Sequence, residues 1–398
     1  MSVLSKRVLE MQESATLAMA RKSRELKEGG VDIINLSLGE PDFDTPDNIK
    51  QACKQALDKG DTKYTPVSGS KALREAICRK LKRENQLDYS FDQIVVSNGA
   101  KQAIANACMA LLNEGDEMLV PSPYWLSYAA IGQLAQAKII EVYAGADENF
   151  KPSAKKIESF ITSKTKVILF SSPCNPTGAV FNHHDLTELV EVLKRYPRIH
   201  VISDEIYEHI NYIGQYTGIA QFDEIKNRVV LINGFSKAYS MTGWRLGYMA
   251  ASKEIAVACD KIQGQITSGA CSFNQTAAIE ALDGNQDKVH FMVNKFKSRR
   301  ELVLNRLKEI PGIICPEPDG AFYVFPDIRA YFGKSAHGYT ISDSEDMALY
   351  LLEKAHVAIV GGKSFGDANC IRISFAASEE MINKAFDRIK AALAQLLI

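Results

Sequence analysis

The chain has 398 residues, of which 46% are hydrophobic and 24% charged, and its formal net charge is −1. A chain of this length usually forms two domains, because a single hydrophobic core stops growing at roughly 250–300 residues. The balanced charge argues against a nucleic-acid or membrane-surface partner, and the longest apolar runs are too short to span a bilayer. The eight cysteines and seven histidines lack paired or metal-ligand spacing. We therefore expect no metal, and reduced thiols in a cytoplasmic protein.

Short β-branched runs alternate with helical patterns over most of the first 290 residues. In chain order, the predicted strands are Gln93–Ser97, Glu117–Val120, Lys138–Val142, Lys166–Ser171, His200–Ser203, Arg228–Asn233 and Arg245–Ala250. Their nearly continuous apolar character predicts burial on both faces, which is typical of a mainly parallel sheet. We expect a large α/β/α domain at residues 46–290, with ligands beyond the carboxyl ends of its strands.

The sequence pattern changes near residue 290. A long charged helix is predicted over Asp287–Glu309, and three further short apolar runs follow it, at Gly320–Pro326, Val357–Gly361 and Cys370–Phe375. Helical patterns separate these runs. We expect a smaller α+β domain made of residues 1–45 and 291–398.

One lysine stands out in the segment Asn233–Gly247, which reads NGFSKAYSMTGWRLG. Lys237 follows a predicted strand and a turn of small residues, so its amine should emerge at the carboxyl end of the strand. If Phe235, Tyr239 and Trp244 wall it in, desolvation lowers its pKa and makes it a nucleophile that can form an imine. The alternative is a solvated surface lysine.

Two further charged residues sit where a free charge is costly. Asp204, in the run VISDEIY, ends a buried strand and needs a partner such as a protonated ring nitrogen. It could also be the N-cap of a helix. Arg372 lies inside the apolar run CIRISF, where a buried carboxylate is its natural partner. That carboxylate could belong to a ligand or to an internal ion pair.

An anion site is predicted at Asn98–Gln102, which reads NGAKQ. A strand, a glycine turn and a helix that starts near Gln102 leave free amide N–H groups pointing outward. Lys101 opposes the helix dipole there. It either faces an anion or is simply solvated. The strand-linked G-x-G-x-x-G and the G-x-x-x-x-G-K-[ST] fingerprints are missing, so dinucleotide and nucleoside-triphosphate binding are not indicated.

These motifs together resemble a known family. The run Gly-Phe-Ser-Lys that ends at Lys237, with Ser240, Gly243, Arg245 and Gly247 after it, resembles the lysine motif of class I and II aminotransferases. The resemblance extends from Gly39–Asp44 to Arg372 and is strongest to the bacterial aspartate aminotransferase subgroup. It implies the type I fold of pyridoxal-phosphate (PLP) enzymes, in which a large domain with a mainly parallel seven-stranded sheet carries a smaller α+β domain.

The resemblance implies PLP as cofactor, held as an imine on Lys237. Asp204 would then pair with the ring nitrogen, and Tyr207 and Asn175 would hydrogen-bond the phenolic oxygen of the ring. The family also has a cis bond between this asparagine and the proline that follows it. Trp125 would be the aromatic plate stacked on the ring, although a large aromatic residue is more often simple core.

For the phosphate of the cofactor, the resemblance implies the amides of Gly99 and Ala100, the Arg245 guanidinium and the Ser236 hydroxyl. Tyr64 resembles the tyrosine that family dimers send to the phosphate of the neighbouring subunit. The chain is therefore expected to form a homodimer with shared active sites. Otherwise Tyr64 is a partly buried anchor ahead of a turn.

The resemblance also assigns the substrate. Arg372 would bind the α-carboxylate of the substrate, and Gly39 would let the backbone come close to the same carboxylate. Lys101, together with the N-terminal segment, would bind a distal carboxylate. The residues expected at the substrate are Ser14, Thr16, Gly39, Lys101, Trp125, Asn175 and Arg372. This set predicts aspartate or glutamate as donor and 2-oxoglutarate or oxaloacetate as acceptor, in a ping-pong reaction.

Several alternatives stay open. Members of this subgroup also use prephenate or aromatic substrates. The ring-binding residues are shared with type I enzymes that catalyse β-elimination, C–S lysis or decarboxylation. A non-catalytic PLP-binding regulator would carry an added DNA-binding domain, for which the predicted fold leaves no residues.

Overall fold

The computed structural model describes residues 3–9, 11 and 13–396, and within them a seven-stranded sheet forms the centre of the molecule. Its strands are β2 (Ile94–Ser97), β3 (Glu117–Ser122), β4 (Lys138–Tyr143), β5 (Thr165–Ser171), β6 (His200–Asp204), β7 (Val229–Gly234) and β8 (Gly247–Ala250). All the strands predicted before residue 290 are therefore confirmed. Their order is β2-β8-β7-β6-β5-β3-β4, and β8 runs antiparallel to both of its neighbours. The other pairings are parallel, as expected.

Side chains from both faces of the sheet are buried. In β5, Ile168 and Phe170 join one hydrophobic cluster, whereas Val167 and Leu169 join another on the opposite face. The continuous apolar run thus reflects alternation between two cores. Helices α4 (Lys71–Asn85) and α8 (His183–Arg195) cover the first face, and α5 (Ala100–Leu111), α6 (Ser127–Leu134) and α9 (Lys253–Ile266) cover the second.

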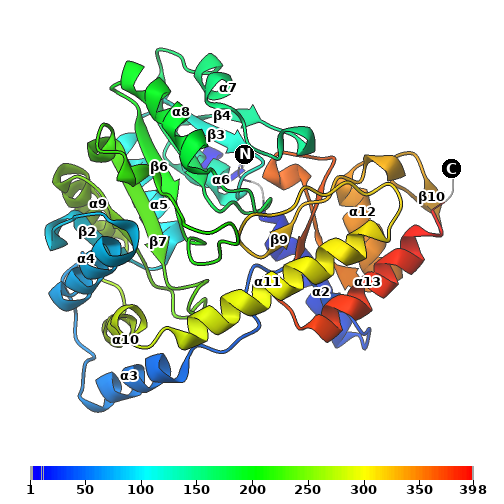
Figure 1. Cartoon of the computed structure of the whole chain (residues 1–398), viewed down its shortest axis with the longest axis horizontal. Coiled ribbons are helices and arrows are strands. Elements are labelled where there is room, and N and C mark those ends of the chain that lie inside the picture. Colours follow the sequence, from blue (N-terminus) through cyan, green and yellow to red (C-terminus); the bar gives the residue numbers. More distant parts are fainter. Residues whose placement is uncertain (1–2, 10, 12, 397–398) are drawn as a thin grey trace.

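The helices around this layered core complete the central region. They are α3 (Asp47–Asp58), which packs on α10 (Ser272–Asp283), and α7 (Ala154–Ser159), which packs on α8. The long helix α11 (Asp287–Lys308), yellow in Figure 1, leads from α10 to the C-terminal elements. It matches the predicted charged helix to within one residue.

The C-terminal and N-terminal segments lie together. A three-stranded antiparallel sheet has the order β13-β14-β9. The elements here are α1 (Lys6–Leu9), α2 (Ala15–Glu28), β1 (Ile34–Asn35), β9 (Tyr323–Val324), β10 (Ser335–Ala336), β11 (Tyr339–Thr340), α12 (Ser344–Tyr350), β12 (Val357–Ala358), β13 (Val360–Gly361), β14 (Ile371–Ser374) and α13 (Glu379–Leu393). The β1 strand pairs in parallel with β12, so the N-terminal segment contacts the C-terminal one (Figure 1). The domain boundaries at residues 46 and 290 stay a prediction.

The parallel strands β3, β5, β6 and β7 end at one edge of the sheet. The loops that follow them carry six predicted site residues, namely Trp125, Asn175, Tyr207, Ser236, Lys237 and Arg245. Within the described residues, no helix is both long enough and apolar enough to cross a membrane.

Candidate active site

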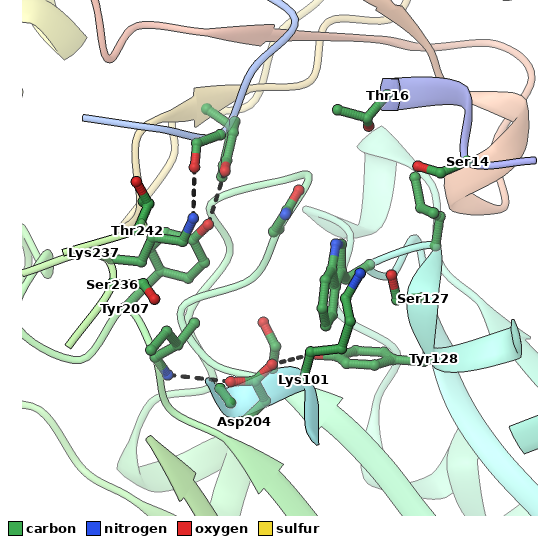
Figure 2. A pocket seen from close by; sticks show the side chains of 18 of the residues that line it. Ser14, Thr16, Lys101, Ser127, Tyr128, Asp204, Tyr207, Ser236, Lys237 and Thr242 are labelled. Carbon is green, nitrogen blue, oxygen red and sulfur yellow. Dashed lines mark hydrogen bonds between the residues drawn. The ribbon is translucent and has the colours of Figure 1, made fainter. Parts of the chain in front are cut away.

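A pocket of about 280 Å³ lies at this edge of the sheet. The predicted residues that line it are Ser14, Thr16, Gly39, Ala100, Lys101, Trp125, Asn175, Asp204, Tyr207, Ser236, Lys237, Arg245 and Arg372. Residues from the two ends of the chain thus meet residues from the central sheet. Figure 2 shows Lys237 and Tyr207 close together on one side and Asp204 beside Tyr128 on another. Among the predicted residues, Gly99 and Tyr64 do not line the pocket.

The Lys237 amine points into this pocket from the loop after β7. It donates a hydrogen bond to the backbone carbonyl oxygen of Gly39 at 2.5 Å. The rings of Tyr207 and Phe322 lie 5.9 and 6.0 Å from the amine. Burial, and after it the Arg372 guanidinium, lower the pKa of Lys237 to about 8. A substantial neutral fraction near physiological pH makes this amine a competent nucleophile.

The prediction that Phe235, Tyr239 and Trp244 surround this lysine is wrong. Phe235 is fully buried and packs against Tyr239, with ring centroids 5.8 Å apart, on the core side of the loop. Trp244 turns away and donates its indole N–H to the Thr45 hydroxyl at 3.0 Å. The rings near the amine, those of Tyr207 and Phe322, come from other segments of the chain instead.

Asp204 is the last residue of β6 and is buried in the pocket floor. Tyr128 donates its hydroxyl to one carboxylate oxygen at 2.6 Å, and the Ile206 amide donates to the other at 3.3 Å. Burial raises the pKa of Asp204 to about 6. The N-cap interpretation is wrong because turns, and no helix, follow this residue. A protonated nitrogen facing it would restore the ionised form.

Tyr128 was missed by the sequence analysis. It lies in α6, three residues after Trp125, and the two rings meet edge to face with centroids 5.5 Å apart. Because Trp125 precedes this helix, which begins at Ser127, helical spacing gave no signal for the pairing. Tyr128 holds the Asp204 carboxylate in place.

Arg372 is 2% exposed, and no carboxylate in the described part of the chain forms an ion pair with it. One guanidinium nitrogen donates to the Asn175 side-chain oxygen at 3.0 Å, and another donates to the Ser37 carbonyl at 2.5 Å. Its Nε atom has no hydrogen-bond partner. A buried cation with an unused donor fits an anionic ligand, and the internal ion pair is not found.

Asn175 reaches Arg372 from the loop after β5. Its bond to the following proline is cis, as predicted, and two further proline bonds that precede residues 123 and 173 are also cis. The side-chain amide of Asn175 lines the pocket. This loop therefore contacts both the guanidinium and the space in front of it.

The anion site has the predicted local form. Helix α5 begins at Ala100, two residues before the expected start, and Gly99 precedes it with a φ of +85°. A Cβ at Gly99 would lie 2.6 Å from a guanidinium nitrogen of Arg245. Glycine is therefore needed both for its φ and for this approach. Ser236 is buried beside the same space, and Arg245 donates to the Thr242 carbonyl at 3.0 Å.

Lys101 lies in the first turn of α5. Its ammonium is 4.9 Å from the centroid of the Trp125 ring. The residue is exposed at the mouth of the pocket, yet partial desolvation, and after it the nearby Arg245 charge, lower the pKa of Lys101. Ser14 and Thr16 line the pocket from the start of α2, on the side away from Asp204 (Figure 2).

Tyr64 lies elsewhere in the single chain. It is 99% exposed and lines a separate hollow with residues 269–273. So exposed a ring is unusual for a large aromatic side chain. The partly buried anchor interpretation is therefore wrong.

A second missed feature supports the segment that carries Asp204 and Tyr207. Lys80, from α4, is 1% exposed and forms an ion pair with buried Glu208. Asn85 and Asn233 also donate to the Glu208 carboxylate, at 2.7 and 2.8 Å. Because Asn233 lies in β7, this one carboxylate joins the Asp204–Tyr207 segment to the strand that leads to Lys237.

The same cluster includes Glu84 and His209, which hydrogen-bond to each other at 3.0 Å. Ligand atoms of Glu84, Glu208 and His209 lie within 4.8 Å of one another, a grouping that sequence spacing did not suggest. The Lys80 ammonium already pairs with both carboxylates, at 3.5 Å from Glu84. The positive charge of Lys80 therefore balances these carboxylates, as a bound metal ion would.

The charges of the pocket are unbalanced. Lys101, Lys237, Arg245 and Arg372 point into it, and within the described residues none of them has an ion-pair partner. Among the described residues that line the pocket, Asp204 is the one carboxylate. The arrangement is suited to a ligand with several anionic groups, one of them at the start of α5 and another at Arg372.

Comparisons with known proteins give one consistent result. Residues 31–389 match the family described as aminotransferase class I and II. A protein of Rhizobium leguminosarum bv. phaseoli, named as a probable aspartate/prephenate aminotransferase, is 46% identical over 98% of both chains.

Solved structures agree. The aspartate aminotransferase of Rhizobium meliloti superposes with a TM-score of 0.96 at 41% identity and covers all of both chains. The aspartate aminotransferase of Thermus thermophilus, solved with maleate, gives a TM-score of 0.92 at 37% identity, over 98% of this chain and all of that one. The fold is therefore the type I fold that the sequence predicted.

Proposed function

The chain belongs to the aminotransferase class I and II family, and from that premise we propose that it transfers the amino group of aspartate or glutamate to 2-oxoglutarate or oxaloacetate. The observation that carries the proposal is the pocket itself. It combines a lysine with a lowered pKa, a buried carboxylate and a buried arginine that has no ion-pair partner in the part of the chain that the structure describes. An amino acid bound by Arg372 would face the Lys237 amine.

PLP, the cofactor of this family, fits the residues present. The Asp204 carboxylate would accept from the ring nitrogen, and the Tyr207 hydroxyl and Asn175 amide would contact the phenolic oxygen. Trp125 would stack on the ring. When bound, the cofactor supplies an electron-accepting ring that stabilises negative charge at the substrate α-carbon.

The phosphate of the cofactor fits the start of α5. The Gly99 and Ala100 amides, the Ser236 hydroxyl and the Arg245 guanidinium would donate to it, and the helix dipole would favour its charge. In a homodimer, Tyr64 of the partner subunit would add a further hydroxyl. The support is that Tyr64 is almost fully exposed in the single chain.

The chain's own groups would then perform the proton transfer. Arg372 and the Gly39 backbone would hold the α-carboxylate, which orients the α-hydrogen. Lys237 Nζ, once free, would accept that proton as a general base. Its lowered pKa supports this role, because a base works best when its pKa is near the operating pH.

Lys101, Ser14 and Thr16 would select an acidic side chain. All three line the pocket, and Lys101 has no ion-pair partner among the described residues. The Thermus relative was solved with maleate, a dicarboxylate. A substrate with a second carboxylate would balance this charge.

We also propose a division into domains at residues 46–290 and at residues 1–45 with 291–398, and a cytoplasmic location. The long helix α11 leads from one proposed domain to the other. The eight cysteines, all within the described part of the chain, are free thiols. Free thiols suit a reducing compartment.

The function is tested by two half-reactions. The purified protein should be yellow, lose this colour with aspartate while oxaloacetate appears, and regain it with 2-oxoglutarate while glutamate appears. Prephenate, which the Rhizobium leguminosarum relative's name includes, should be tried as a second acceptor. Borohydride reduction and peptide mass analysis should place the cofactor on Lys237. A label on another residue, or release of free ammonia with no amino acid formed from 2-oxoglutarate, would contradict the proposal.

The selectivity is tested at Lys101. Lys101→Ser should lower kcat/KM for aspartate about 10- to 150-fold, because a charged hydrogen bond contributes about 1.5–3 kcal/mol. Alanine, which has no distal carboxylate, serves as the control substrate, and its half-reaction rate should change less than about threefold. Full aspartate activity in this variant would refute the assignment of Lys101.

A further inference from the structure

Tyr323 is a fully buried side chain of the pocket that the sequence patterns did not single out. It lies in β9, in the small three-stranded sheet, next to the strand that carries Arg372. Its hydroxyl is 2.8 Å from the Tyr207 hydroxyl. The Arg372 guanidinium carbon lies 4.7 Å from the centroid of its ring. One side chain therefore touches two predicted ligand-binding residues.

The direction of the hydrogen bond between the two tyrosines follows from their proton count. A hydroxyl has one proton to donate, and in the proposed function Tyr207 would donate its proton to the oxygen of the cofactor ring. Toward Tyr323 it then has to accept. The Tyr323 hydroxyl has no other hydrogen-bond partner within the described residues. Burial raises the pKa of Tyr323, so the phenol keeps its proton and remains a donor.

The surroundings leave Tyr323 little freedom. A Cβ built on Gly39 would collide with the Tyr323 hydroxyl, so the Gly39 backbone closes over it. The same backbone accepts the Lys237 hydrogen bond. The Phe322 ring packs at 4.9 Å from the Tyr323 ring. The hydroxyl is thus held at Tyr207 by packing from several sides.

We propose that Tyr323 is a positioning residue. Its hydroxyl donates to Tyr207 and so strengthens the hydrogen bond from Tyr207 to the cofactor ring, and the aromatic ring of Tyr323 packs against the Arg372 guanidinium. This inference rests on the proposed function. A chain of hydrogen bonds in a site of low dielectric strengthens each bond by about 10–30%. The Arg372 guanidinium is held over the Tyr323 ring by electrostatic attraction to the aromatic face.

Two substitutions separate the hydroxyl from the ring. Tyr323→Phe removes the hydroxyl alone. A weaker bond from Tyr207 leaves the cofactor with a higher proton affinity, so the pH midpoint of its visible absorption should rise by ~0.1–0.7 unit. KM for aspartate should change less than about twofold. Tyr323→Leu also removes the ring and should raise KM about 3- to 30-fold.

The coupling through Tyr207 has its own test. Tyr207→Phe should shift the midpoint further than Tyr323→Phe does. The double variant should match Tyr207→Phe, because the Tyr323 hydroxyl then has nothing to act through. Tyr350→Phe is the matched control: it also loses a buried hydroxyl, bonded to the Ala392 carbonyl at 2.8 Å, and should not move the midpoint.

The outcomes can be told apart. If Tyr323→Phe leaves the midpoint unchanged, or if its shift adds fully to that of Tyr207→Phe, this inference is overturned and the proposed function stands. If the wild-type protein has no visible cofactor band, the proposed function fails and this inference fails with it. Thermal unfolding of each variant without cofactor shows whether a shift accompanies loss of structure.

Discussion

Lys237→Ala should lower the rate of the aspartate half-reaction by at least about 10²–10⁴-fold, the usual contribution of a general base. The variant loses the amine that would accept the α-proton, while Asp204, Arg245 and the start of α5 remain to hold the cofactor. Single-turnover kinetics with aspartate measure the effect. Lys261, an exposed lysine of α9, provides a matched control, because Lys261→Ala should keep the wild-type rate.

Cofactor binding distinguishes this result from a loss of structure. Lys237→Ala should still bind PLP, although without the covalent link that borohydride traps. A variant that binds no PLP, or one that retains more than a tenth of the wild-type rate, would contradict the role of Lys237.

The pKa of Lys237 also makes a pH dependence part of this prediction. The neutral amine is the nucleophile, and its pKa is lowered to about 8 by burial and then by Arg372. The rate of PLP attachment to the cofactor-free protein should therefore rise with pH up to about 8 and level off above it. An attachment rate that keeps rising to pH 10 would show a solvated lysine instead.

Lys80→Met should lower the free energy of unfolding by about 3–5 kcal/mol, the usual effect of removing one member of a buried ion pair. The substitution leaves the Glu208 carboxylate buried without its cation. Burial raises the pKa of Glu208, but Lys80 and His209 outweigh it and hold that pKa below its ordinary value. Urea unfolding of the cofactor-free protein measures the difference.

A double variant is the control for this effect. Lys80→Met with Glu208→Gln leaves this pair without a buried charge, so most of the lost stability should return, and the Gln amide oxygen can still accept from one of Asn85 and Asn233. If the effects of the two substitutions on the free energy of unfolding simply add, Lys80 and Glu208 are not coupled and the prediction is wrong. Because the folded-state pKa of Glu208 is depressed, the pair's stabilisation is present above the ordinary glutamate pKa and is lost as pH falls through the folded-state value.

The sequence predicted the central sheet because its signal is local. A run such as Val167–Phe170 is apolar at every position, and the structure buries alternate side chains of this strand in two different cores. The short C-terminal strands are less regular. Val357–Gly361 divides into β12 and β13, which join different sheets, and a continuous run cannot reveal that division.

The candidate site was predictable where a residue type conflicts with its surroundings. Lys237, Asp204 and Arg372 carry charges beside buried strands, and each lies in the same pocket. Tyr128, Tyr323 and the Lys80–Glu208 pair gave no such conflict, because a buried tyrosine is ordinary and a lysine in an amphipathic helix is usually exposed.

By itself, the sequence determined the strands of the sheet, the turn that frees the amides before α5 and the residue types that bind anions, because these follow from neighbours along the chain. Only the tertiary structure decided which rings surround Lys237, which hydroxyls hold Asp204 and Tyr207, and which cation neutralises Glu208. Those partners come from segments tens to hundreds of residues apart. Their contacts depend on how the layers pack, and packing is set by the shape of the whole core.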